Sequence, residues 1–209
     1  MEIKDVVNKL PTHPTKKYIK RPITAITTTV VHHSLTVDLS GDKDIYAFAR
    51  YHVNNHGWPG IGYHYVIDRD GTIYKTNYLT TKSYHVGNHN IYCIGVCLVG
   101  DFRTDDPTYI QYKSLYDLLE NLVSTYSTEI KGHSEMPGYE WKQCPAINMD
   151  EIRKTLITRM EIKGYNTAKT DINSTGGGDK TTSPENKDLN LIQIIVSLIK
   201  SILSLFKRS

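Results

Sequence analysis

A run of β-branched residues at positions 23–31 constrains the possible fold more than any other feature of the sequence. Every residue in this range except Ala25 is isoleucine, threonine or valine. These side chains are stiff at χ1 and pack well on a pleated surface, so the run predicts a buried strand. It ends in His32 and His33. Because neighbouring side chains on a strand point to opposite faces, only one of these two histidines can face a given site.

The other regular segments mix helical and β patterns. Helical apolar spacing, with capping signals at the starts of the second and third segments, predicts three helices, at residues 42–57, 107–126 and 148–160. β-rich runs predict a hairpin over residues 60–75, with Asp70 and Gly71 in its turn, and a second buried strand over residues 91–102. This order of elements predicts an α/β (α+β) fold in which helices flank a central mixed β-sheet.

Composition and charge argue against several classes of protein. The 209 residues are 39% hydrophobic and 22% charged, which is typical of a soluble protein with a core. The net charge is +3, and residues 165–209 contribute +2 of it, from six basic and four acidic residues. The nearly neutral remainder argues against nucleic-acid binding. Three cysteines argue against a disulfide framework, and the N-terminus has no secretory-signal pattern, so we expect synthesis in a reducing cytoplasm.

The composition changes near residue 165 and predicts three parts. Residues 1–164 have the pattern of a folded domain, and residues 165–187 predict a flexible linker rich in glycine, serine and threonine. In residues 188–209 polar side chains recur every three or four positions, which predicts an amphipathic hydrophobic helix. About 18 helical residues span about 27 Å, just short of a bilayer core. Three roles stay open for this helix: contact with a membrane interface, self-association, or packing on the first domain.

One group of candidate metal ligands is better explained as part of a strand. His85, His89, Cys93 and Cys97 recur every four residues, and on a helix they would share one face. The residues between them are glycines and strong β-formers, which oppose a helix. On a strand the two cysteines lie about 13 Å apart at roughly 3.3 Å per residue, too far for one metal ion. We therefore interpret both cysteines as small buried hydrophobic residues.

A better metal site combines a strand with a loop. Residues 131–146 are punctuated by glycine and proline, so they predict a loop that can bring His133 and Cys144 to one ion. One histidine from the end of the β-branched run would add a third ligand. Three protein ligands with a fourth position left for water describe a catalytic zinc site rather than a structural one.

Five segments follow one another along residues 20–160 in a recognisable order: TTTVVHHS, YHVNNHGWPGIGYHYVIDRDGTIY, HVGNHNIYCIGVCLVGDF, PTYIQYKSLYDLL and GHSEMPGYEWKQCP. Together they resemble the zinc-dependent N-acetylmuramoyl-L-alanine amidase family, which includes phage-type amidases and animal peptidoglycan recognition proteins. The resemblance implies the amidase and peptidoglycan-recognition fold. It also implies that residues 1–164 are a zinc amidase catalytic domain.

The resemblance assigns a zinc ligand to each of three positions, His32, His133 and Cys144, with His33 as the alternative to His32. The spacing from His133 to Cys144 is about three residues longer than in the family pattern, and residues 139–141 are the expected insertion. Non-catalytic relatives tend to lack the cysteine ligand, whereas Cys144 is present here.

Further residues match positions around the zinc. Tyr63 and Lys142 take the family's catalytic positions, in which the lysine stabilises an oxyanion and the tyrosine positions water or its proton. His85 takes a substrate-binding position that lines the cleft. We also expect Trp58 and Trp141 to line the substrate groove, although either could instead belong to the core.

The function implied is zinc-dependent hydrolysis of the amide bond between N-acetylmuramic acid and L-alanine in bacterial peptidoglycan. Such an endolysin or autolysin would be made in the bacterial cytoplasm without a signal peptide and would act on the cell wall after release by a holin or by lysis. Two alternatives stay open. The protein could bind peptidoglycan without cutting it, or it could act on membranes through residues 188–209 with the amidase as an auxiliary.

Overall fold

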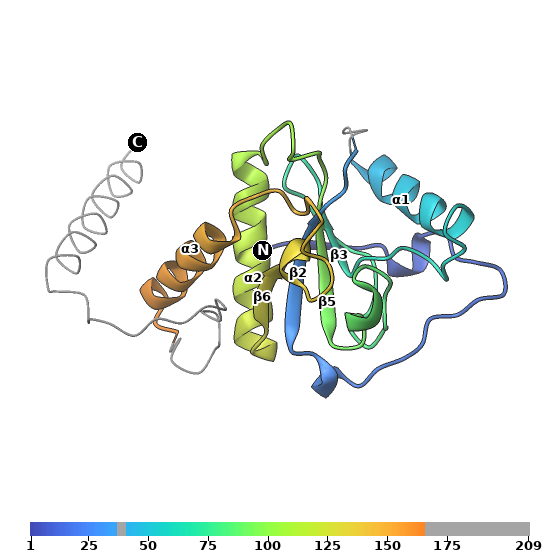
Figure 1. Cartoon of the computed structure of the whole chain (residues 1–209), viewed down its shortest axis with the longest axis horizontal. Coiled ribbons are helices and arrows are strands. Elements are labelled where there is room, and N and C mark those ends of the chain that lie inside the picture. The colour runs from blue at the N-terminus through green and yellow to red at the C-terminus, as the bar shows by residue number, and fades with distance from the viewer. Residues whose placement is uncertain (37–40, 166–209) are drawn as a thin grey trace, which may run out of the picture. The chain divides into compact units, whose positions relative to one another are not determined.

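The β-branched run forms the strand β2 (Thr28–His33), in which every residue is buried. β2 lies inside a six-stranded mixed sheet of order β1-β4-β3-β5-β2-β6 (Figure 1). Its neighbours β5 (Cys93–Leu98) and β6 (Glu129–Gly132) both run parallel to it. The sequence pattern also places residues 23–27 in this strand, and there it is wrong. Thr28 pairs with the first residue of β5, so earlier residues lie beyond the ladder, and Ile23–Ala25 form a 3-10 helix.

The predicted hairpin is confirmed. β3 (Tyr65–Ile67) and β4 (Ile73–Lys75) are antiparallel, and β1 (Ile3–Asp5) extends the sheet beside β4. Gly71 in the turn has φ +84°, a conformation that favours glycine. A Cβ at this position would also lie 2.6 Å from the Ile110 side chain, so the turn needs a glycine to pack against the helix α2 (Tyr109–Tyr126), which contains Ile110.

The three predicted helices are also confirmed, as α1 (Asp42–Asn54), α2 (Tyr109–Tyr126) and α3 (Met149–Ile162). Thr108 caps α2 with the expected reciprocal capping box to Gln111. Asn148 caps α3 by accepting a hydrogen bond from the Glu151 amide.

Helices cover the two faces of the sheet (Figure 1). α2 and α3 pack on one face, in a core that includes Val31 and alternate residues of β5. α1 packs on the other face, in a core that includes Cys97. Because side chains alternate along β2, Val31 faces α2 and α3, whereas His32 faces the same side as Cys97, its partner in the ladder.

The computed structural model describes residues 1–36 and 41–165, which belong to one compact unit. The predicted linker at 165–187 lies outside these residues except for Tyr165, and the predicted helix at 188–209 lies wholly outside them. Both therefore stay predictions. Among the described residues, no helix combines the length and the apolar character needed to cross a bilayer.

Candidate metal centre

Three side chains meet at the carboxyl end of β2. One ligand atom from each of His32, His133 and Cys144 lies within 4.8 Å of the other two, and all three residues are buried. Cys144 Sγ is 3.8 Å from His32 Nδ1, and the rings of His32 and His133 have centroids 4.6 Å apart. Residues more than one hundred positions apart in the sequence thus converge on one point.

The loop after β6 returns to the sheet because of specific backbone contacts. His133 begins a 3-10 turn, His133–Glu135, directly after β6. The amide of Ser134 donates to the carbonyl of Cys144 over 2.8 Å, which closes the loop. A Cβ at Gly132 would lie 2.8 Å from the Pro145 ring, so only glycine lets the returning chain approach β6 this closely.

An ion-paired arginine fixes the start of the same loop. Glu135 accepts a hydrogen bond from the Gly132 amide over 2.7 Å. Arg153 of α3 donates to both carboxylate oxygens of Glu135, over 2.8 and 2.9 Å. Such a bidentate pair is geometrically specific, so α3 helps to position His133.

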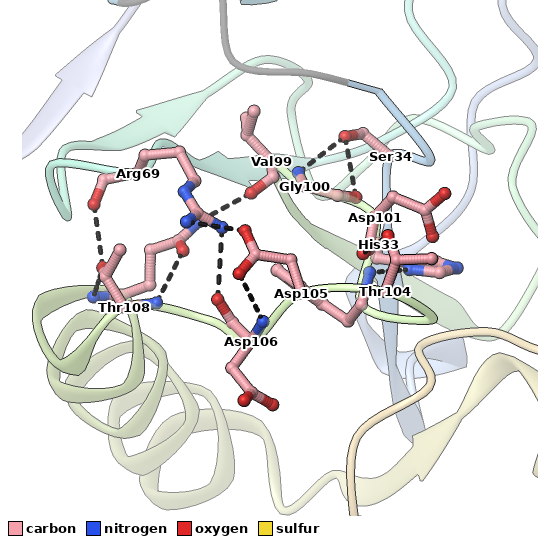
Figure 2. A network of polar contacts seen from close by, with 12 residues as sticks. His33, Ser34, Arg69, Val99, Gly100, Asp101, Thr104, Asp105, Asp106 and Thr108 are labelled. Carbon is pink, nitrogen blue, oxygen red and sulfur yellow. Dashed lines mark hydrogen bonds and ion pairs between the residues drawn. The ribbon is translucent and has the colours of Figure 1, made fainter.

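His33 has a different role from His32. It points to the other face, where its Nδ1 accepts a hydrogen bond from the Phe102 amide over 3.0 Å. Figure 2 shows His33 beside the polar network of the loop that follows β5, in which Arg69 pairs with Asp105 and donates to the Asp106 carbonyl. His33 therefore holds this loop and does not contribute to the group of three.

The pKa values at the centre favour metal binding by the histidines. Burial lowers the pKa of His32 well below its ordinary value, and nearby His85 and His133 lower it further. Burial and the charge of Lys142 lower the pKa of His133 to about 4. Both rings are therefore neutral near pH 7, which is the form that binds a metal ion.

The pKa of Cys144 is shifted in the opposite direction, upward. Burial raises the pKa of its thiol to about 11, opposed by the backbone of His33 and the charge of Lys142. A bound divalent cation would compensate the thiolate charge. His133 Nε2 is buried with no hydrogen-bond partner among the described residues. Two imidazoles and a thiol, with a buried nitrogen left unsatisfied, fit a zinc ion.

Tyr63 and Lys142 lie beside the three candidate ligands. The rings of Tyr63 and His32 have centroids 5.4 Å apart. Burial raises the pKa of Tyr63 well above its ordinary value, and Cys97 and Cys144 act in the same direction, so the phenol keeps its proton. Lys142 Nζ lies 4.4 Å from the centre of the Trp141 ring, and its positive charge lowers the pKa of His133.

The two tryptophans differ in their surroundings. Trp141 is exposed, with 73% of its surface accessible, so it is not a core residue. Trp58 is half-buried and stacks against His56, with ring centroids 4.6 Å apart, and it contacts His52 in a tilted arrangement, with centroids 4.9 Å apart. His52 in turn contacts Tyr63, with centroids 5.6 Å apart.

The residues spaced by four do not form a metal cluster. Cys93 and Cys97 are fully buried on β5, as the interpretation of both as hydrophobic residues predicts. His89 contacts Tyr92 and the carbonyl of Pro137. His85 alone reaches the metal centre, where its Nδ1 lies 2.9 Å from His32 Nε2.

One buried residue, Arg21, supports this region although no sequence pattern predicts it. Arg21 is 3% exposed and donates to the carbonyls of Leu79, Asn90, Ile91 and Cys93. It fixes the loop between His85 and β5. A single arginine in a basic segment, KKYIKRP, carries no pattern that distinguishes it from a solvated one.

Together, the mixed sheet, its helices and a His–His–Cys group at the end of a central strand define the fold of amidases and peptidoglycan recognition proteins. N-acetylmuramoyl-L-alanine amidase LysC from Clostridium intestinale URNW superposes with a TM-score of 0.60 and 25% identity, over 75% of this chain and 98% of that one. Drosophila peptidoglycan recognition protein SD shares the fold, with a TM-score of 0.59 and 18% identity over 69% of this chain and 89% of that one.

The sequence comparison then gives the family. The profile of the N-acetylmuramoyl-L-alanine amidase family (Amidase_2) matches residues 22–147, which is more than half of the chain. The protein belongs to this family, as the sequence resemblance predicts.

Curated relatives come from both branches of the family. Peptidoglycan-recognition protein SC2 of Drosophila melanogaster is 31% identical over 49% of this chain and 57% of its own length. The endolysin of Escherichia phage T7 is 34% identical over 44% of this chain and 64% of its own length. The chain thus spans about three fifths of the curated relatives that it matches.

Proposed function

We propose that the protein is a zinc-dependent N-acetylmuramoyl-L-alanine amidase. It hydrolyses the amide bond between N-acetylmuramic acid and L-alanine in bacterial peptidoglycan. The observation that carries this proposal is the convergence of His32, His133 and Cys144 within 4.8 Å beside Lys142 and Tyr63. Family membership over residues 22–147 supports the choice of reaction.

His32, His133 and Cys144 would hold the ion. Zinc bound there supplies a Lewis acid that lowers the pKa of water toward about 7 and polarises the scissile carbonyl. The two histidines bind as neutral imidazoles, and Cys144 loses its thiol proton on binding.

Lys142 and Tyr63 would act on the substrate. The Lys142 ammonium donates hydrogen bonds to the carbonyl oxygen as negative charge develops on it. The Tyr63 phenol, which burial keeps protonated, is a hydrogen-bond donor that positions the attacking water. Trp141, exposed next to Lys142, offers a flat apolar surface to the glycan or its stem peptide.

Metal analysis of the full chain tests this function against the binding alternative. We expect about one zinc per chain in the wild type and far less in Cys144→Ser, because a hydroxyl is a poor zinc ligand. Chelation should stop digestion of purified cell wall, and added zinc should restore it. A chain that binds peptidoglycan but takes up no zinc would instead be a non-catalytic binding protein.

The location and partners proposed follow from this reaction. The substrate lies in the bacterial wall, so the enzyme acts there after release from the cytoplasm by a holin or by lysis. Contact with a membrane, or self-association, through residues 188–209 stays a prediction from the sequence.

A further inference from the structure

The two ring nitrogens of His32 have different neighbours. Nδ1 faces Cys144, 3.8 Å from its sulfur, and is therefore the nitrogen directed at the candidate ligand group. Nε2 points away from that group and lies 2.9 Å from Nδ1 of His85. The planes of the two rings are nearly perpendicular, at 88°, so an edge of His32 meets His85.

This arrangement fixes where the protons must be. A nitrogen that binds a metal ion offers its lone pair, so the proton of neutral His32 must sit on Nε2. Nε2–H then donates to Nδ1 of His85, which must be an acceptor. The proton of neutral His85 consequently sits on its own Nε2, an atom buried away from solvent.

His85 offers little surface to a substrate. It is 9% exposed, and its Nε2 is inaccessible. Its other nitrogen is already occupied by His32. Nδ1 of this ring is thus used inside the protein, and Nε2 is buried without a hydrogen-bond partner among the described residues.

The fold holds the His85 ring from several sides. The backbone amides of His85 and Val86 both donate to Oδ1 of Asn90, over 2.9 Å each. The carbonyl of Asn90 accepts a hydrogen bond from the buried Arg21 over 2.9 Å. On the sheet side, a Cβ at Gly95 would lie 2.7 Å from the His85 ring, so this glycine provides the space that the ring occupies.

We propose that His85 is a positioning residue for the metal centre: it accepts a hydrogen bond from Nε2–H of His32 and so fixes the tautomer and orientation that direct Nδ1 at the ion. This inference rests on the zinc site of the proposed function. Residues that orient a ligating histidine in this way typically contribute about 10–100-fold to metal affinity.

A matched pair of substitutions tests the hydrogen bond itself. Leucine and asparagine have nearly the same shape, but only asparagine places an acceptor, Oδ1, close to the position of the imidazole Nδ1. Zinc affinity is measured in the full chain by competition with a chromogenic chelator. We expect His85→Leu to lose about 10–100-fold in affinity and His85→Asn to recover most of that loss.

Two further variants separate positioning from general damage. His89→Asn changes a histidine of the same loop that has no contact with the ligands, so it should keep the wild-type zinc affinity. Gly95→Ala retains every histidine but displaces the His85 ring, so it should weaken zinc binding in a folded protein even if His85→Leu does not fold. Circular dichroism of each zinc-free protein reports folding.

The outcomes distinguish this inference from the function on which it rests. If the wild type binds no zinc, the proposed function itself fails. If the wild type binds zinc and both His85→Leu and Gly95→Ala bind it equally well, only the positioning role is overturned. If His85→Leu raises KM for wall fragments but leaves zinc affinity unchanged, the positioning role is also overturned, and His85 is instead a substrate-contacting residue.

Discussion

At the scale of single residues, the centre combines groups that burial keeps in their neutral forms. His32 and His133 are neutral, and the Cys144 thiol is protonated in the metal-free protein. The three candidate ligands include no carboxylate, so none of them forms an ion pair with the nearby cation Lys142. A divalent ion would therefore enter a site that has ligands in place and one positive side chain available for a developing oxyanion.

Lys142 should contribute to the reaction and not to metal binding. We expect Lys142→Met to reduce the rate of wall hydrolysis by about 10²–10³, because one donor to the oxyanion is lost. Zinc affinity should not fall, since removing a cation near His133 removes a repulsion. Lys154→Met, on the exposed side of α3, is the control. Comparable zinc binding with undiminished hydrolysis in Lys142→Met would show that the lysine is a bystander.

The choice between His32 and His33 shows what strand alternation can and cannot predict. The pattern correctly indicates that the two side chains point apart, but it contains no information on which face carries the site. That face is set by tertiary packing: Val31 enters the core under α2 and α3, so His32 turns to the opposite side. The family resemblance, not the periodicity, selected His32.

At the scale of elements, long segments with strong patterns were predictable, and so were the short hairpin strands β3 and β4 beside their turn signal, whereas the other short strands were not. β2, β5 and the three helices follow from β-branched runs, apolar periodicity and caps. β1 and β6 have three and four residues, too few for a period to emerge. Each owes its place to a neighbour in the sheet, β4 and β2 respectively, and such long-range pairing leaves no local signal.

Arg21 should matter more for stability than its position before a proline suggests. Its removal takes the arginine donor from two buried carbonyls, those of Asn90 and Cys93, and a buried group left unsatisfied costs about 1–3 kcal/mol. We expect Arg21→Met to lower the free energy of unfolding by at least about 2 kcal/mol, measured by urea denaturation. Lys20→Met, the exposed neighbouring residue, should change it little. Equal effects of the two substitutions would refute this role.

His64 should make the sheet sensitive to acid. The Gly95 amide donates to its Nδ1, so Nε2 carries the proton and donates to the Thr81 carbonyl. Burial, with Arg21 nearby, lowers the pKa of His64 from 6.5 to about 3. The unfolded chain therefore takes up a proton below about pH 6.5 that the folded chain refuses.

The contribution of His64 to stability should decrease as the pH falls. The stability contributed by neutral His64 is complete above pH 6.5 and is lost as the pH falls toward 3, by about 1.4 kcal/mol per pH unit. The free energy of unfolding, measured by urea denaturation between pH 7 and 4, should fall less steeply with decreasing pH for His64→Asn than for the wild type. Identical slopes would contradict the buried neutral state.

At the scale of the whole molecule, the fold and the metal centre are separable. The hydrophobic clusters on the two faces of the sheet do not include His32, His133 or Cys144. The site is thus placed on a scaffold that is stabilised by other residues. The sequence predicted this scaffold for residues 1–164. The predicted linker at 165–187 and the predicted helix at 188–209 lie outside the described residues, apart from Tyr165, and stay predictions.

Zinc removal should therefore lower stability without unfolding the protein. Free zinc at one hundred times its Kd stabilises a folded chain by about 2.7 kcal/mol if the unfolded chain does not bind it. We expect the chelated protein to keep its far-UV circular dichroism and to unfold at a lower temperature, reversibly on adding zinc. Loss of secondary structure on chelation would mean that the ion is structural, and an unchanged melting temperature would mean that none is bound.

The most direct test of the proposed reaction is to map the products of digested peptidoglycan. Purified wall is treated with the wild-type chain and with Cys144→Ser, and both new amino termini and new reducing sugar ends are quantified. The proposed amidase predicts new alanine amino termini without new reducing ends, and the loss of these termini with Cys144→Ser. New reducing ends without alanine amino termini would indicate cleavage of a glycosidic bond and would contradict the proposal.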